Sequence, residues 1–252
     1  MHPKSVSVAP PIAWFVVAGQ SGARGPADDL PYYACEQDHV WNWDLATDEI
    51  KVLYDPYDNL RGSVAPRLAD YLRANGFASV GFIPVAQSGV ASSAFVPPAS
   101  LYLSAVAEVT AALAAAPAGS YLAGVIIYQG ETDAIDNTGG ATWSANWTAY
   151  VEGLETDLAA VTGVTLPIRT LVVRLPVTAV TGTPQPDWDD IRDGQDDFAA
   201  ARPNPGTDSL IVQAPVAVLD NGLHLGMGAD DTEGFRKLAV DSGAEIVGNW
   251  LP

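Results

Sequence analysis

A continuous apolar run that ends in a glycine-flanked turn is the feature that most limits the fold. Residues 12–18 are apolar and rich in aromatic and β-branched side chains, and Gly19, Gln20, Ser21 and Gly22 follow them directly. A run of this length and composition is typical of a strand buried on both faces, as in parallel sheets covered by helices. Ser21 is therefore predicted at the carboxyl end of a central strand, where α/β sheets bind ligands.

Ser21 has two interpretations in this position. A serine on a strand-to-helix turn holds its hydroxyl out for attack as a nucleophile. Alternatively, it only caps the helix that follows. The short Gly-x-Ser-Gly pattern does not decide between them, so the rest of the chain has to.

The remaining chain alternates strand-like and helix-like segments. Five apolar runs are predicted as strands, at 12–18, 79–86, 122–129, 168–175 and 209–216. Helical spacing is found at 65–74, 100–116, 141–161, 187–201 and 230–250. This alternation predicts an α/β fold with a parallel, doubly wound sheet and right-handed crossovers. No linker or repeat interrupts residues 1–252, so we expect a single domain.

Charge and cysteine content exclude several classes of protein. The chain has 30 acidic against 12 basic residues, a formal charge of −18, which disfavours binding to nucleic acid or anionic membranes. Cys35 is the only cysteine, so neither an intrachain disulfide nor a thiolate metal site is expected. The sequence shows no visible signal peptide and no apolar run of about 18 residues. We expect a soluble protein, with an extracellular or virion-associated location left open because a leader can be missing.

Polar residues and glycines follow the predicted strands where a scaffold would not need them. Gly89 follows the second strand, residues 129–133 follow the third, and residues 219–224 follow the last. Acyl transfer needs a nucleophile, a base, an acid that orients the base, and donors for an oxyanion. Side chains of all four kinds occur at these strand ends.

These blocks resemble those of a known family, the sialate O-acetylesterase-type carbohydrate esterases of the SGNH/GDSL hydrolase superfamily. The resemblance is carried by residues 19–21, 83–86 with Gly89, 128–133, 191–195 and 222–224. It covers about residues 12–240 in the family's block order. It implies a three-layer α/β/α sandwich with a central five-stranded, mainly parallel sheet in the flavodoxin-like order. It also implies removal of acetyl groups from sugars with no metal and no organic cofactor.

The resemblance assigns roles residue by residue. Ser21 matches the nucleophile and His224 the general base. The backbone N–H groups of Ser21 and Gly89 and the side-chain amide of Gln129 match the oxyanion hole. The alternative for Gln129 is a strand-end hydrogen bond to a loop.

The acid that orients the base is less clear from the sequence. In the superfamily it precedes the histidine by three residues, and that position here is Asn221, which carries no charge. Asp220, one residue further back, is one candidate, Glu131 is another, and a Ser-His dyad without an acid is the third. We favour Glu131, because it is the proposed acid in some members of the resembling family.

Other positions are predicted to support the site. Gln20, Arg192 and Gln195 match polar residues that contact substrate or brace the site, and Arg192 can equally form a structural salt bridge. Gly22 departs from the asparagine that is common in the family. The segment 25–61, rich in acidic and aromatic residues, is too long for a plain loop. It is expected either to wall the site with aromatic rings for a sugar or to form a satellite core.

The sequence thus predicts a serine esterase that removes O-acetyl groups from carbohydrate through an acetyl-enzyme on Ser21, as in sialate O-acetylesterases or acetylxylan esterases. The first alternative is a lipase or thioesterase of the same fold, which would prefer longer acyl chains. The second is a carbohydrate-binding protein that has lost catalysis. The expected partner is an O-acetylated carbohydrate, and the oligomeric state cannot be read from the sequence.

Overall fold

The computed structural model describes residues 9–24, 33–53, 63–179, 182–215 and 230–251. Its strands are β1 (Ala13–Gly19), β2 (Val40–Asp44), β3 (Glu49–Val52), β4 (Val80–Ala86), β5 (Tyr121–Tyr128), β6 (Thr170–Arg174) and β7 (Ser209–Gln213). Its helices are α1 (Ser21–Arg24), α2 (Ala65–Ala74), α3 (Ser100–Ala115), α4 (Glu131–Ile135), α5 (Gly140–Asp157), α6 (Gln185–Ala201) and α7 (Gly234–Trp250), with a 3₁₀ turn η1 (Ser92–Phe95).

The five predicted strands form one parallel sheet in the expected order. The full sheet order is β3-β2-β4-β1-β5-β6-β7. Neighbours among β4, β1, β5, β6 and β7 are all parallel. If only these five are numbered along the chain, their order is 2-1-3-4-5, which is the flavodoxin-like order.

The predicted number of strands was too low. β2 pairs parallel to β4, and β3 pairs antiparallel to β2, so the sheet has seven strands. Both added strands come from the 25–61 segment. They are short and lie toward the edge of the sheet, where a strand needs less apolar sequence than a central one does. Of the four residues of β3, none is buried.

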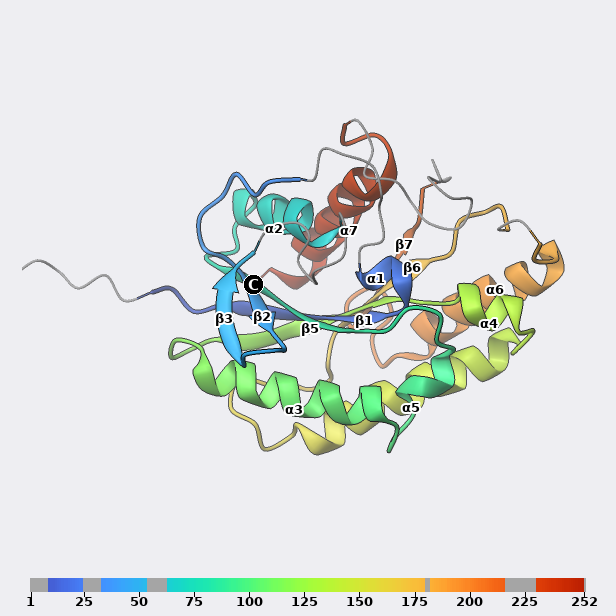
Figure 1. Cartoon of the computed structure of the whole chain (residues 1–252), viewed down its shortest axis with the longest axis horizontal. Coiled ribbons are helices and arrows are strands. Elements are labelled where there is room, and N and C mark those ends of the chain that lie inside the picture. The colour runs from blue at the N-terminus through green and yellow to red at the C-terminus, as the bar shows by residue number, and fades with distance from the viewer. Residues whose placement is uncertain (1–8, 25–32, 54–62, 180–181, 216–229, 252) are drawn as a thin grey trace, which may run out of the picture.

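Helices cover both faces of the sheet, which confirms the three-layer sandwich. α2 and α7 lie on one face, and α3, α5 and α6 lie on the other (Figure 1). Two separate hydrophobic clusters fill the spaces between the layers, and the strands contribute alternate side chains to each. In the part of the chain that the structure describes, no helix has the length and hydrophobicity needed to span a membrane.

β1 is the middle strand of the sheet, and all seven of its residues are buried. It pairs with β4 on one side and β5 on the other, and Gly19 is level with both Ala86 and Tyr128. The carboxyl ends of the three strands therefore reach the same edge of the sheet. The segments that follow them, each predicted to carry site residues, start side by side.

The aromatic residues of the 25–61 segment that are described contact the scaffold. The Trp43 indole is buried and donates a hydrogen bond of 2.7 Å to Glu108 in α3. The Trp41 indole donates to the Ser79 hydroxyl at 2.8 Å, and the Tyr33 hydroxyl donates to Asp70 at 2.8 Å. These contacts favour the satellite core over walls for a sugar. Tyr32, Tyr54 and Tyr57 lie outside the described residues.

Helices α5 and α6 contact each other through glycines, Gly140 in α5 and Gly194 in α6. A Cβ added to Gly194 would lie 2.3 Å from the carbonyl oxygen of Gly140, and one added to Gly140 would lie 2.0 Å from the Asp190 carbonyl oxygen. The Asp190 carboxylate also accepts a hydrogen bond of 2.9 Å from the Gly140 N–H. This contact fixes α6, which carries Arg192 and Gln195, against α5.

We expect Gly194→Ala to destabilise the protein by about 1–3 kcal/mol, since the helices must separate to admit the methyl group. Gly248→Ala in α7 is the matched control, because no described residue outside the local helix backbone has an atom within 4 Å of the added Cβ. Alanine is the better helix former by up to about 1 kcal/mol, so this control should be neutral or stabilising. Urea unfolding of both variants measures the difference, and equal effects would contradict the crossing geometry.

Candidate active site

The turn that carries Ser21 is held against the ends of both neighbouring strands. Gly19 has a φ of +147°, and a Cβ there would lie 2.0 Å from the Tyr128 carbonyl oxygen, so only glycine fits. The Gln20 N–H donates to the same carbonyl at 3.2 Å, and the Gln87 N–H donates to the Gly19 carbonyl at 3.0 Å. Ser21 begins α1 directly after this turn and is 7% exposed.

The Tyr128 ring accounts for glycine at position 22. A Cβ on Gly22 would lie 2.7 Å from the ring carbon that bears the Tyr128 hydroxyl. The ring fills this space because it packs edge-on against Phe235 of α7, with the centroids 6.4 Å apart. Burial raises the pKa of Tyr128, with the Glu131 charge adding to the effect, so the hydroxyl keeps its proton. The family's usual asparagine at position 22 would collide with this ring.

The Gln129 side chain lies wholly inside the protein. Its oxygen accepts from the indoles of Trp143 at 2.6 Å and Trp147 at 3.3 Å. Its nitrogen donates to the Asp133 carboxylate and to the Val90 carbonyl at 3.2 Å. An amide nitrogen has only two hydrogens, and both have acceptors here. The structure therefore favours the loop-bonding alternative for Gln129 over the expected oxyanion donor.

Asp133 is the centre of this buried cluster, and the sequence analysis gave it no role. Its carboxylate is 0% exposed and accepts hydrogen bonds from the Ser92 N–H at 2.8 Å and the Ser92 hydroxyl at 2.6 Å, besides that from Gln129. The Asn146 amide donates to the Ser92 hydroxyl at 2.9 Å. The sequence offered one signal for Asp133, which is its place as an acidic residue within the block 128–133, two of whose other polar residues were assigned to the site.

Glu131 begins α4 at the same edge and is 4% exposed. Among the described residues, its Oε2 has no hydrogen-bond partner. Burial raises the pKa of Glu131 to about 7, and the Asp133 charge adds to this while the N–H groups of Glu131 and Gly130 oppose it. A buried carboxyl with one unpaired oxygen is costly, which makes Glu131 a candidate for a role outside the scaffold.

Gly89 lies in the exposed turn after β4 with a φ of +71°. Among the residues that the structure describes, none has an atom within 4 Å of a Cβ built at this position. Glycine is favoured by the backbone angle and not by crowding. An exposed turn that no described residue crowds is compatible with a backbone N–H that meets a ligand.

The three residues expected to brace or contact substrate all contact the scaffold. The Gln20 side-chain oxygen accepts from the Thr132 N–H at 3.2 Å. Gln195 is fully buried and joins β5 to β6, accepting from the Leu175 N–H at 2.9 Å and donating to the Gln129 carbonyl at 3.1 Å. Arg192 pairs with Asp189 at 3.0 Å and donates to the Leu175 carbonyl at 3.3 Å. The bracing interpretation fits all three.

His224 and Asp220 lie outside the described residues. Their roles as base and acid stay predictions. The described part of the carboxyl edge contains Ser21, Gly89 and Glu131, each at the end of a neighbouring strand of the sheet.

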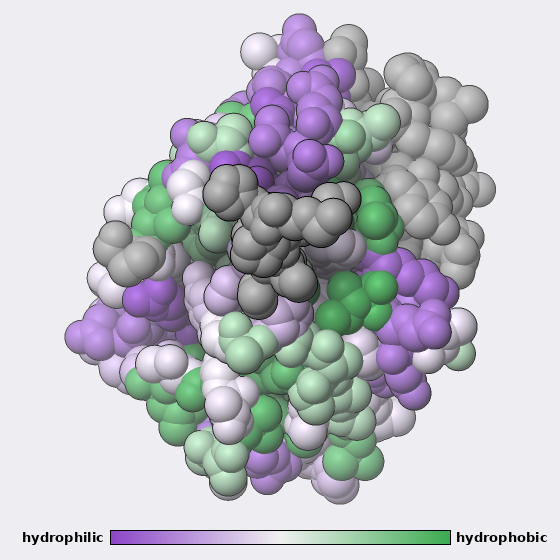
Figure 2. All heavy atoms as spheres, turned by 90° about the vertical axis from the view of Figure 1, so that its left-hand side faces the viewer, coloured by the Kyte–Doolittle hydropathy of each residue, from purple (hydrophilic) through white to green (hydrophobic). Residues whose placement is uncertain are grey.

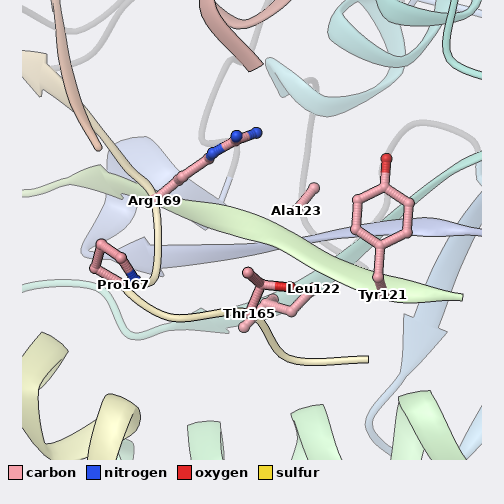
Figure 3. Close-up of a pocket in the computed structure, with 6 residues that line it drawn as sticks. All are labelled: Tyr121, Leu122, Ala123, Thr165, Pro167 and Arg169. Carbon is pink, nitrogen blue, oxygen red and sulfur yellow. The ribbon is translucent and has the colours of Figure 1, made fainter. Parts of the chain in front are cut away.

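A cavity of about 140 Å³ lies at the opposite edge of the sheet. It is lined by Tyr121, Leu122, Ala123, Thr165, Pro167 and Arg169. Tyr121 and Arg169 extend to the same side of β5 (Figure 3). Tyr121 starts β5 and Tyr128 ends it, so at about 3.3 Å per residue the cavity lies about 23 Å from the Ser21 edge. Figure 2 views this end of the molecule, where apolar and polar side chains are interspersed.

Solved structures share the fold at low sequence identity. A protein from Arabidopsis thaliana is 18% identical with a TM-score of 0.77, and the match covers 96% of this chain and 100% of that one. A carbohydrate acetylesterase from Xanthomonas citri is 18% identical with a TM-score of 0.64, over 94% of this chain and 56% of that one. NanS is 14% identical with a TM-score of 0.61, over 81% and 78%. No curated protein sequence matches this chain.

A family comparison provides the functional class. The family described as "Carbohydrate esterase, sialic acid-specific acetylesterase" matches residues 12–196, which include the Ser21 turn, Gly89 and the block from Tyr128 to Asp133. This match spans most of the sheet and agrees with the resemblance seen in the sequence. The chain belongs to this family of carbohydrate esterases, and it is a carboxylic ester hydrolase of the SGNH/GDSL fold.

Proposed function

We propose that the protein removes O-acetyl groups from carbohydrate through an acetyl-enzyme on Ser21. The observation that carries the proposal is the position of Ser21, on the turn after the central strand, level with the ends of β4 and β5. Ser21 Oγ attacks the acetyl carbonyl while His224 accepts its proton. His224 then gives this proton to the sugar oxygen as the acyl bond breaks. Water repeats the sequence on the acetyl-enzyme and releases acetate.

The oxyanion of each tetrahedral intermediate is stabilised by the backbone N–H groups of Ser21 and Gly89. The exposed turn at Gly89, which none of the described residues crowds, supports its role. Fixed N–H groups that point at a developing charge stabilise the transition state more than the ground state. Gln129 is omitted from this set because its amide hydrogens are used inside the protein.

Glu131 is the acid that orients His224 in this proposal. Its buried Oε2, which has no hydrogen-bond partner among the described residues, and its position beside the Ser21 turn support this assignment over Asp220. An ionised carboxylate stabilises the imidazolium that forms when His224 accepts the serine proton. The family description points to O-acetylated sialic acid as the first sugar to test, with acetylated xylan as the second.

We expect Ser21→Ala to lower the rate on para-nitrophenyl acetate by at least about a thousandfold, because the nucleophile is lost. Ser93→Ala is the matched control, since Ser93 is exposed in η1. The parent enzyme should prefer the acetate to the butyrate and octanoate esters. A preference for the long esters would support a lipase-like enzyme, and a Ser21→Ala variant as active as the parent would exclude Ser21 as the nucleophile.

We expect Glu131→Gln to lower kcat by about 10²- to 10⁴-fold with little change in KM, because a neutral amide cannot stabilise the imidazolium by charge. Asp220→Asn should stay within a few-fold of the parent. The reverse ranking would assign the acid to Asp220 instead. Equal activity of both variants and the parent would point to a Ser-His dyad.

The pKa of Glu131, raised to about 7 by burial, also predicts a pH dependence. The ionised carboxylate is the active form, so kcat/KM should fall as the pH decreases through about 7. In Glu131→Gln, the remaining dependence should be that of His224 alone. A pH profile of kcat/KM from pH 5 to 9 checks this, and identical profiles for the two proteins would contradict the assignment.

A further inference from the structure

We propose that Asp133 is a positioning residue that holds the oxyanion N–H of Gly89 in place, through Ser92 and Gln129. This inference rests on the proposed function. It assigns Gln129 to the same task and not to direct contact with the oxyanion. Neither residue touches the substrate in this proposal, and both act through the backbone that follows β4.

Asp133 fixes one end of the segment that contains Gly89. Ser92 lies three residues after Gly89, and both its N–H and its hydroxyl donate to the Asp133 carboxylate, at 2.8 and 2.6 Å. Two donors on one residue define its position and its orientation relative to the carboxylate. Since Ser92 is fully buried, water does not compete for these bonds.

Gln129 fixes the middle of the same segment. Its amide nitrogen donates to the carbonyl of Val90, the residue directly after Gly89, at 3.2 Å. The indoles of Trp143 and Trp147 both donate to the oxygen of this amide, and these two bonds determine which way the amide is oriented. The NH₂ group must then face Asp133 and Val90. The turn that carries Gly89 is therefore held by hydrogen bonds at the next residue, which is half-buried, and at the third residue after it, which is fully buried.

The same network reaches the nucleophile. The Gln20 side-chain oxygen lies 3.5 Å from the Gln129 nitrogen and accepts the Thr132 N–H at 3.2 Å. Gln20 directly precedes Ser21. The two proposed oxyanion donors, on Ser21 and Gly89, thus belong to segments that both contact Gln129: the Gly89 segment accepts a hydrogen bond from it, and the Gln20 side chain lies 3.5 Å from it. Asp133 accepts the other hydrogen bond of the Gln129 amide.

The free energy needed to bury the Asp133 carboxylate supports a role in catalysis. A fully buried carboxylate is expensive to desolvate, and a packed apolar group of the same size often stabilises a fold at least as well. What the carboxylate supplies is a defined geometry for three donors on two segments. Defined geometry matters most where a displacement of about 1 Å lowers the rate by about 10²-fold.

The test compares Asp133→Asn and Ser92→Ala with Ser93→Ala. The Ser92 N–H and the Gln129 amide both donate to Asp133 Oδ2, and the Ser92 hydroxyl donates to Oδ1. An asparagine keeps only one of these two acceptor oxygens and also loses the charge that strengthens all three bonds. We expect Asp133→Asn to lower kcat on para-nitrophenyl acetate by about 10²-fold with KM within about threefold. Ser92→Ala, which keeps the backbone N–H bond, should lose about tenfold. Ser93→Ala should match the parent.

Inhibition by methylboronic acid separates positioning from mere stability. The boron adds to the serine hydroxyl, and a boron-bound oxygen then occupies the place of the oxyanion. We expect its inhibition constant to rise by the same factor as kcat falls in each variant, because both report the oxyanion donors. Thermal melting of each variant measures stability separately.

The activity, boronate affinity and melting temperature of the variants together test the role of Asp133. Variants that lower the melting temperature but keep the parent kcat and boronate affinity would overturn it. If Asp133→Asn does not fold, Ser92→Ala decides alone, since it removes only one hydroxyl. An inactive Ser21→Ala beside a fully active Ser92→Ala would refute this inference and leave the proposed function intact. An active Ser21→Ala would refute the proposed function itself.

Discussion

The backbone contact between Gly19 and Tyr128 determines how the carboxyl edge of the sheet is built. Since Gly19 has no side chain, the end of β1 lies directly against the carbonyl at the end of β5. The Gln20 N–H bonds to that carbonyl, and the Gln20 side chain bonds to the start of α4. The serine turn and the turn that carries Glu131 are therefore one connected unit. A side chain at position 19 would separate them.

Different interactions hold the two ends of the sheet together. Away from the carboxyl edge, burial of apolar side chains in two clusters holds the layers together, as expected for the dominant force in folding. At the carboxyl edge, buried polar groups replace apolar ones, and they are held by directional bonds among Gln129, Asp133, Ser92 and two indoles. Directional bonds add less net stability than apolar packing, but they specify geometry. The edge that carries Ser21 is the one where, in the proposed function, the reacting groups have to be held in defined positions.

The sequence predicted the central sheet because its five strands are long apolar runs separated by helical segments. It missed β2 and β3 because strands near an edge need little apolar sequence. It located Gln129 correctly at a strand end, but the direction of an amide depends on Trp143 and Trp147, which lie 14 and 18 residues further on. Asp133 was missed for the same reason, since its donor Ser92 is 41 residues away. Long-range contacts of side chains leave no pattern in one sequence.

Glu131 and Asp133 show how one short helix separates two carboxylates. Residues two apart on an α-helix point about 200° apart, so the two side chains leave α4 in nearly opposite directions. Asp133 enters a cluster with three donors and is fixed by them. Glu131 is buried, which raises its pKa to about 7, and its Oε2 has no partner among the described residues. Opposite environments for neighbouring acids are how one fold assigns them different tasks: Asp133 holds the structure, and Glu131 stays available for a base.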